Sequence, residues 1–291
     1  MFKTVGVVGA GLMGSEIALV FALAGRRVKL NDTNPALLDE SAKRLERVLQ
    51  KGIDRGLYAE DAIEVVLPQI QFCPTLEDYS KCDLVVEAVF EDEEVKSTVF
   101  GELDRIVSDH CVIASNTSSI SITTLASKVS EFRRTRFIGT HFFSPVSKMK
   151  LVEVIPGMDT DRAIIEDVMS ECKDIGKTPI EVKDVVGFAV NRLLHAMMIE
   201  ATRLVEEGVA TPEDIDVACR LGLGHPIGPF QLMDATQLSL SLQVQEILSA
   251  AYGDRFKPRP IMKQMVGAGY NGKRSGRGWY KASRSVAIKE S

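Results

Sequence analysis

Several features that define other classes of protein are scarce or absent in these 291 residues. The five cysteines are odd in number and include no CxxC pair: Cys73, Cys82, Cys111, Cys172 and Cys219. This pattern argues against a disulfide framework, favours a reducing compartment, and gives no sign of a metal-ligand set. No apolar run approaches the roughly 20 residues that are needed to span a bilayer.

The chain has fewer basic than acidic residues, so its formal net charge is −5 and its isoelectric point is about 5.6. A nucleic-acid-binding domain is normally basic, so we expect no nucleic acid partner. The first strand pattern begins at Lys3 and leaves no room for a cleavable leader. We therefore expect a cytoplasmic protein that does not enter a membrane.

The first part of the chain alternates between strand and helix patterns. Short β-branched runs recur in "KTVGVVGAG", "RRVKLND", "QIQFC", "CDLVVEAV", "CVIA" and "TRFIGTHFF", with helical stretches between most of them. This alternation predicts an α/β fold of the Rossmann type, with a mostly parallel, doubly wound sheet. Helical patterns dominate after Asp184, so we expect one domain over residues 1–184 and an all-helical domain over residues 185–291.

A glycine-rich turn follows the first predicted strand. Gly9, Gly11 and Gly14 have the GxGxxG spacing, with a strand pattern before them and a helix pattern after them. In this motif the first glycine makes a tight turn, the second lets a pyrophosphate approach, and the third lets the helix pack closely. Asp32 ends the second strand, where an acid can bind a ribose diol and repel a 2′-phosphate. The pattern predicts NAD as the cofactor.

Two further segments place polar side chains where strands leave the sheet. The stretch "SNTSSIS" follows the strand "CVIA", and His141 ends the strand "RFIGTHFFSP". Glu153 lies in the aliphatic stretch "KMKLVEVIP", where a carboxylate without a partner is costly to bury. If the chain turns back around Ser147, His141 and Glu153 face one another. Spacing alone is compatible with a general base held by its acid and equally with a structural pair.

The segments "GAGLMGSEIA", "VVEAVFEDEEVK", "SNTSSISI", "THFFSPVSKMKLVEVI", "GFAVNRLL", "GHPIGPF" and "GRGWYK" occur in this order along the chain. Together they strongly resemble the L-3-hydroxyacyl-CoA dehydrogenases, including 3-hydroxybutyryl-CoA dehydrogenases, over essentially the whole length. The resemblance implies NAD-dependent oxidation of a 3-hydroxyacyl-CoA substrate, reversibly, by a homodimer. Its first domain would bind NAD, and its second would serve substrate binding and dimerisation.

The resemblance also implies roles for individual residues. His141 would be the catalytic base, Glu153 would orient it, and Ser118 and Asn191 would complete the site and bind substrate. The implied cofactor-binding residues are Gly9, Gly11, Leu12, Met13, Gly14, Asp32, Glu91, Lys96, Asn116, Ser118, Ser144 and Arg274. The "SNTSS" loop would lie where the nicotinamide meets the thioester. Ser144 departs from the family's common HFFNP pattern, so its contact with the cofactor is an open point.

A set of basic residues follows helical steps along the predicted helix after Pro35: Arg44, Arg47, Lys51 and Arg55. Such a set is ordinarily a solvated face, but the resemblance makes Lys51 and Arg55 candidates for binding the anionic end of coenzyme A.

Two alternatives stay open beside this reading. One is a sugar-acid or carnitine dehydrogenase on the same scaffold. The other is a recruited crystallin-like protein without activity. The β-hydroxyacid dehydrogenase group is a poor alternative, because it relies on a lysine of the interdomain helix and no lysine occurs between Lys183 and Lys257.

Overall fold

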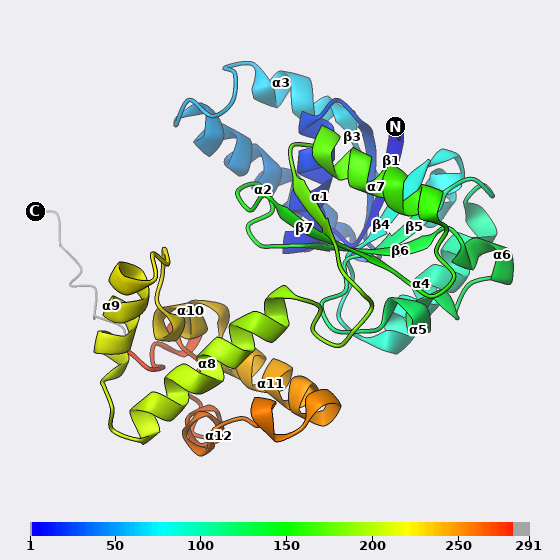
Figure 1. Cartoon of the computed structure of the whole chain (residues 1–291). Coiled ribbons are helices and arrows are strands. Elements are labelled where there is room, and N and C mark those ends of the chain that lie inside the picture. The colour runs from blue at the N-terminus through cyan, green and yellow to red at the C-terminus, as the bar shows by residue number, and fades with distance from the viewer. Residues whose placement is uncertain (1, 282–291) are drawn as a thin grey trace, which may run out of the picture. The chain divides into compact units, whose positions relative to one another are not determined.

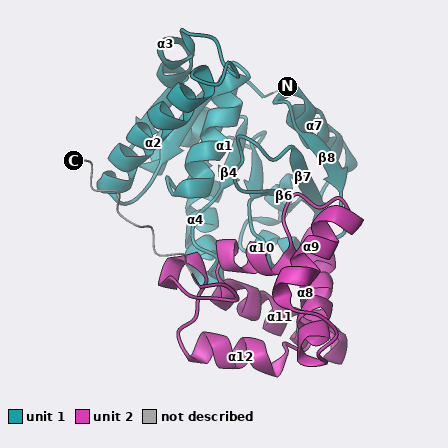
Figure 2. Ribbon diagram, turned by 90° about the vertical axis from the view of Figure 1, so that its left-hand side faces the viewer, with its two compact units in different colours: residues 1–185 teal, residues 186–291 magenta. Residues whose placement is uncertain are grey.

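The chain divides into two compact units, Met1–Val185 and Val186–Ser291, which Figure 2 colours separately. The structure is a computed structural model that describes residues 2–281. The expected division after Asp184 lies one residue before this one. Among the described residues, no helix combines the length and the apolar character that crossing a bilayer requires.

One eight-stranded sheet organises the first unit, in the order β3-β2-β1-β4-β5-β6-β7-β8 (Figure 1). Its strands are β1 (Thr4–Val8), β2 (Arg27–Asn31), β3 (Ile70–Cys73), β4 (Leu84–Glu87), β5 (Val112–Ser115), β6 (Phe137–Phe142), β7 (Leu151–Pro156) and β8 (Thr178–Glu181). All neighbouring strands are parallel except β6 and β7. The predicted α/β class with a mostly parallel sheet is therefore confirmed.

Helices cover both faces of this sheet. They are α1 (Leu12–Leu23), α2 (Pro35–Ile53), α3 (Ala62–Val66), α4 (Glu93–Ile106), α5 (Ile122–Ala126), α6 (Glu131–Arg134) and α7 (Arg162–Asp174), with the 3₁₀ turns η1 (Leu67–Gln69) and η2 (Leu76–Lys81). Apolar side chains of α1, α2 and α7 share one core with alternate residues of the strands. On the opposite face, Phe100 of α4 meets Phe137 of β6 edge to face, with ring centroids 4.8 Å apart.

Helix ends in the first unit follow the capping residues of the sequence. Asn34 caps α2 through the amide of Ala36, with Pro35 in the first turn as predicted. Asp92 caps α4 through the amides of its first turn. One expectation was wrong: α2 ends at Ile53, so Arg55 lies in the following turn and does not share a helix face with Lys51.

The second unit is helical, as predicted. Its helices are α8 (Val190–Glu206), α9 (Pro212–Gly222), α10 (Pro229–Thr236), α11 (Leu238–Tyr252) and α12 (Pro260–Gly267), with the turns η3 (Asp254–Phe256) and η4 (Lys273–Ser275). Their core includes Phe230 and Met233, and Trp279 packs against Phe230 at 4.5 Å between ring centroids. The chain enters α8 through Gly187 and Phe188, which both have positive φ. Because of this conformation α8 starts only at Val190, although the helical pattern of the sequence begins before that residue.

Candidate active site

The turn between β1 and α1 shows why each glycine of the motif is needed. Gly9 has a φ of +100°, and a Cβ at that position would lie 2.7 Å from the carbonyl oxygen of Ala88. A Cβ at Gly14 would lie 1.8 Å from the carbonyl oxygen of Gly9. At Gly11, by contrast, no described atom lies within 4 Å of an added Cβ. Packing therefore requires glycine at positions 9 and 14, while Gly11 leaves an open approach to the backbone.

The turn also fits the phosphates and the ribose of a dinucleotide. No side chain within residues 2–281 caps the N-terminus of α1, so the amides of its first turn, including those of Leu12 and Met13, remain available to an anion. Asp32 follows β2, and its carboxylate accepts the amide hydrogens of Ala10 at 2.8 Å and Asn34 at 2.9 Å. These bonds fix the carboxylate beside the turn, where a diol would find an acceptor.

The antiparallel pairing of β6 and β7 brings the expected histidine and glutamate together. His141 lies directly opposite Glu153 in the register, and the chain reverses in the 143–150 segment around Ser147, as expected. The two atoms His141 Nδ1 and Glu153 Oε2 are 2.8 Å apart. Glu153 is fully buried and His141 nearly so. Both side chains leave the sheet on the α4 side, because their strand neighbours Val152 and Phe142 face the other core.

The other ring nitrogen of the histidine points toward the polar loop after β5. His141 Nε2 lies 3.0 Å from the hydroxyl of Ser118. A carboxylate at Glu153 only accepts hydrogens, so in the tautomer that satisfies this pair Nδ1 donates to Glu153 and leaves Nε2 as an acceptor. The line Glu153–His141–Ser118 thus presents a basic nitrogen beside a hydroxyl at the edge of the sheet.

Other expected site residues in the first unit also surround this loop. The Asn116 side-chain oxygen accepts the amide hydrogen of Phe142 at 2.9 Å, which joins the loop to the strand that carries His141. Glu91 accepts hydrogens from the loop amides of Ser118 and Ser119. The ammonium group of Lys96 lies 3.3 Å from Glu91 Oε2.

The remaining expected residues lie elsewhere in the fold. Ser144 precedes a cis peptide bond to Pro145. Lys51 belongs to the last turn of α2. Asn191 belongs to the first turn of α8 in the second unit. The guanidinium of Arg274, also in the second unit, donates to the side-chain oxygen of Gln237 at 3.2 Å.

Two carboxylates that hold the loop were missed by sequence reasoning. Glu87 ends β4 inside an apolar run and accepts the hydroxyl hydrogen of Ser115 at 2.7 Å. Asp184 accepts the hydroxyl hydrogen of Ser121 and the amide hydrogens of Ile122 and Thr123, so it secures the far end of the loop. Glu87 carried the same signal that singled out Glu153, which is an acid within an aliphatic strand.

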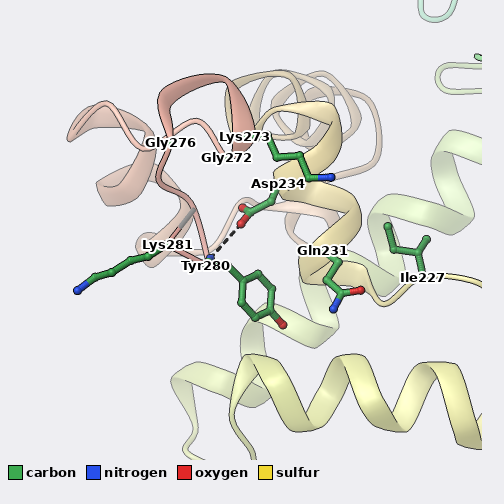
Figure 3. A pocket seen from close by; sticks show the side chains of 8 residues that line it. All are labelled: Ile227, Gln231, Asp234, Gly272, Lys273, Gly276, Tyr280 and Lys281. Atoms are coloured by element: carbon green, nitrogen blue, oxygen red, sulfur yellow. Dashed lines mark hydrogen bonds between the residues drawn. The ribbon is translucent and has the colours of Figure 1, made fainter. Parts of the chain in front are cut away.

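The second unit contains a small hollow beside α10 (Figure 3). Asp234 accepts the amide hydrogens of Trp279 and Tyr280, both at 2.9 Å, and so ties the closing segment of the described chain to this helix. Lys273 and Tyr280 line the hollow, and the Tyr280 hydroxyl donates to the buried carboxylate of Asp216 at 2.7 Å. Arg274, which the resemblance assigns to cofactor binding, directly follows Lys273 of this hollow in the sequence.

Comparison with known proteins extends over both units. The family profile described as "3-hydroxyacyl-CoA dehydrogenase, NAD binding domain" matches residues 4–185. The profile described as "3-hydroxyacyl-CoA dehydrogenase, C-terminal domain" matches residues 187–282.

Individual relatives match nearly their whole length. A probable 3-hydroxybutyryl-CoA dehydrogenase of Bacillus subtilis is 42% identical over 279 residues, which cover 96% of each chain. The mitochondrial hydroxyacyl-coenzyme A dehydrogenase of Sus scrofa is 40% identical over 97% of this chain and 91% of its own. The crystal structure of (S)-3-hydroxybutyryl-CoA dehydrogenase from Ralstonia eutropha superimposes with a TM-score of 0.93 at 40% identity, covering 98% of this chain and 100% of that one. With both domain profiles matched in order, this chain belongs to the 3-hydroxyacyl-CoA dehydrogenase family, whose N-terminal domain binds NAD.

Proposed function

We propose that this chain interconverts (S)-3-hydroxyacyl-CoA and 3-ketoacyl-CoA with NAD, and that 3-hydroxybutyryl-CoA and acetoacetyl-CoA are its preferred pair. The single observation that carries the chemistry is the line from Glu153 through His141 to Ser118, with successive separations of 2.8 Å and 3.0 Å. The choice of a short acyl chain rests on the relatives that are named 3-hydroxybutyryl-CoA dehydrogenases.

In the oxidative direction, His141 Nε2 accepts the proton of the substrate's 3-hydroxyl group. Glu153 stabilises the resulting imidazolium through Nδ1, because a hydrogen bond between a carboxylate and a cation is stronger than one between a carboxylate and a neutral ring. Ser118 binds the reacting oxygen, and by the resemblance to the family we assign Asn191 to substrate binding as well. Bound NAD supplies the acceptor for the hydride that leaves C3. General-base assistance of this kind is worth about 10²- to 10⁴-fold in rate.

Cofactor and coenzyme A would bind at separate parts of the first unit. The glycine turn and Asp32 suit the dinucleotide, as their geometry leaves the backbone at Gly11 open. Lys51 and Arg55 are exposed cations at the end of α2, and they suit the phosphates of coenzyme A. We further propose a homodimer formed through the second unit, and a cytoplasmic location like that expected for the bacterial relatives.

The proposal is tested by following NADH consumption with acetoacetyl-CoA and with 3-ketoacyl-CoA substrates of increasing chain length. We expect turnover with all acyl-CoA substrates that fit and the highest kcat/KM with acetoacetyl-CoA. Free acetoacetate, which lacks coenzyme A, is the matched control and should react far more slowly. Absence of acyl-CoA reduction, or equal turnover of sugar-acid or carnitine-type substrates, would overturn the proposal.

A further inference from the structure

A hollow in the first unit lies where α1, the end of α7 and the chain reversal between β6 and β7 come together, and we call it the α1–α7 hollow. Its volume is about 280 Å³, just below the range of roughly 300–1,000 Å³ that is usual for pockets enclosing a whole small ligand. Val20 and Leu23 of α1 and Ile175 beyond α7 give it an apolar lining. The hollow therefore suits one part of a larger molecule, such as a single ring system.

Positive charge is concentrated on the α1–α7 hollow. Lys148, Lys150 and Lys177 all line it. Lys148 and Lys150 are exposed, and neither forms an ion pair with residues 2–281. Asp174 is the single carboxylate among the lining residues, and its Oδ2 atom lies 3.5 Å from the guanidinium of Arg26. The hollow therefore offers two exposed cations to an anionic ligand.

The wall that carries these two exposed lysines is held in place from two elements. The ammonium group of Lys177, which is 8% exposed, donates to the backbone carbonyl oxygen of Met149 at 3.0 Å. From α1, the buried carboxylate of Glu16 accepts the amide hydrogen of Ser147 at 3.0 Å. Two buried charged groups thus clamp the reversal, so both exposed lysines extend from a fixed backbone. A preformed wall of this kind lowers the entropic cost of binding a ligand.

An aromatic side chain connects the α1–α7 hollow with the end of α2. Tyr58 lines the hollow, and its ring also packs against the last turn of α2, where a Cβ at Gly52 would lie 2.1 Å from ring atom Cδ2. Lys51 and Arg55, the cations proposed above for coenzyme A, flank Gly52 in the sequence. One aromatic ring is therefore shared by two sets of basic residues, one in the hollow and one at the end of the helix.

We propose that the α1–α7 hollow binds the adenosine end of coenzyme A. This adenosine carries a 5′-diphosphate and a separate 3′-phosphate, so its recognition needs cations in two places. Lys148 and Lys150 bind one of these phosphate groups, and the cations at the end of α2 bind the other. The adenine ring lies between them, against Tyr58 and the apolar lining. The inference rests on the proposed function, because it names the residues that recognise the nucleotide of the substrate.

The double substitution Lys148→Gln with Lys150→Gln removes both charges and keeps most of the length of each side chain. We expect the KM for acetoacetyl-CoA to rise about tenfold or more, while kcat and the KM for NADH stay within about twofold, because contacts far from the reacting carbon act on binding. Acetoacetyl-pantetheine has the reacting group but no nucleotide, so it should react at the same rate in wild type and variant. Lys3→Gln with Lys81→Gln is the matched control, since it removes two exposed charges of the same unit outside the hollow.

Direct binding tests the hollow without turnover. Adenosine 3′,5′-bisphosphate is titrated calorimetrically into the wild type and the double variant, with NADH saturating so that the dinucleotide site is occupied. We expect its Kd to be about tenfold or more higher in the variant. An unchanged KM for acetoacetyl-CoA, an equal loss with acetoacetyl-pantetheine, or equal bisphosphate affinity in the two proteins would overturn the inference. If the wild type reduces no acyl-CoA, the proposed function falls, while the bisphosphate titration still decides whether the hollow binds a nucleotide.

Discussion

At the scale of single residues, we expect Asp32 to determine which dinucleotide the glycine turn accepts. Its carboxylate is fixed by the amides of Ala10 and Asn34, so it cannot turn away from a 2′-phosphate. Arg26 offers no compensation, because its guanidinium is paired with Glu171 at 2.7 Å. Two like charges at close range repel strongly at a partly buried site.

We therefore predict that kcat/KM with NADH exceeds that with NADPH by about tenfold or more. Asp32→Ser should narrow this preference, whereas Asp39→Ser, which changes an exposed acid on α2, should leave it unchanged. Steady-state kinetics with both cofactors measures the ratio. Comparable efficiencies in the wild type would contradict the role given to Asp32.

Single residues also mark how far the sequence could predict the site. Glu153 was predictable because a carboxylate in an aliphatic strand needs a partner, and His141 lay within reach of one chain reversal. Glu87 carried the same signal, but its partners Lys96 and Ser115 come from a helix and a strand that meet it only in the folded protein. Local patterns identify the need for a partner; they do not identify the partner.

At the scale of elements, α8 contains a titrating group that the chemistry does not use. His195 is buried, and burial lowers its pKa to about 4 from an ordinary value of 6.5. Its Nδ1 atom has no hydrogen-bond partner within the described residues. The unfolded chain therefore binds a proton more readily than the folded one between these two values, so stability falls as the pH falls from 6.5 toward 4.

We predict that His195→Leu flattens this dependence. The urea midpoint of the wild type should be lower at pH 5 than at pH 7, and the difference should shrink in the variant. His110→Leu, which changes an exposed histidine, should keep the wild-type difference. An unchanged difference between the two pH values in folded His195→Leu would show that this histidine is not responsible.

Helix α2 gives the second prediction at this scale. Lys51 in its last turn and Arg55 in the turn beyond it are exposed cations, and neither forms an ion pair with residues 2–281. Replacing both with Glu should raise the KM for acetoacetyl-CoA about tenfold or more and leave the KM for NADH nearly unchanged. Lys81→Glu, on the separate element η2, controls for reversing one exposed charge away from α2. Equal effects on both KM values would contradict the assignment of Lys51 and Arg55 to coenzyme A binding.

The elements themselves were largely predictable from capping and periodicity. Asn34 and Asp92 begin α2 and α4, and Thr211 begins α9, each through a side-chain bond to an amide of the first turn. The ends were less predictable. α8 starts after Gly187 and Phe188 because both residues adopt positive φ. The apolar pattern of the sequence does not predict this conformation for Phe188, because a bulky residue rarely adopts it.

At the scale of the whole molecule, the second unit exposes large apolar side chains that a folded monomer leaves in water. Leu193 is 74% exposed on α8, and Leu221 is 82% exposed at the end of α9. Leu223, just beyond α9, is 66% exposed. Leu221 and Leu223 lie two residues apart in the sequence, and contiguous exposed apolar patches are typical of interaction surfaces.

We predict a homodimer mass by light scattering at micromolar concentration. Replacing Leu221 and Leu223 with Glu should shift the mass toward that of a monomer, because the charges would have to be buried without partners. Leu57→Glu, at an equally exposed leucine of the first unit, is the control and should remain dimeric. A monomeric wild type would contradict this arrangement.

In the proposed mechanism, turnover depends on one proton transfer to His141, and Glu153 should act with this histidine as a unit. His141→Gln and Glu153→Gln should each lower turnover severely, and the double variant should lose much less than the product of the two single losses. Independent, fully multiplicative losses would separate Glu153 from the base.

The most direct measurement is the kcat of folded His141→Gln for acetoacetyl-CoA reduction, with NADH binding measured in parallel. Removal of Nε2 as the proton-transfer group predicts a kcat lower by about 10²- to 10⁴-fold, with a Kd for NADH near that of the wild type. A folded variant that retains near-wild-type turnover would show that His141 is not the catalytic base.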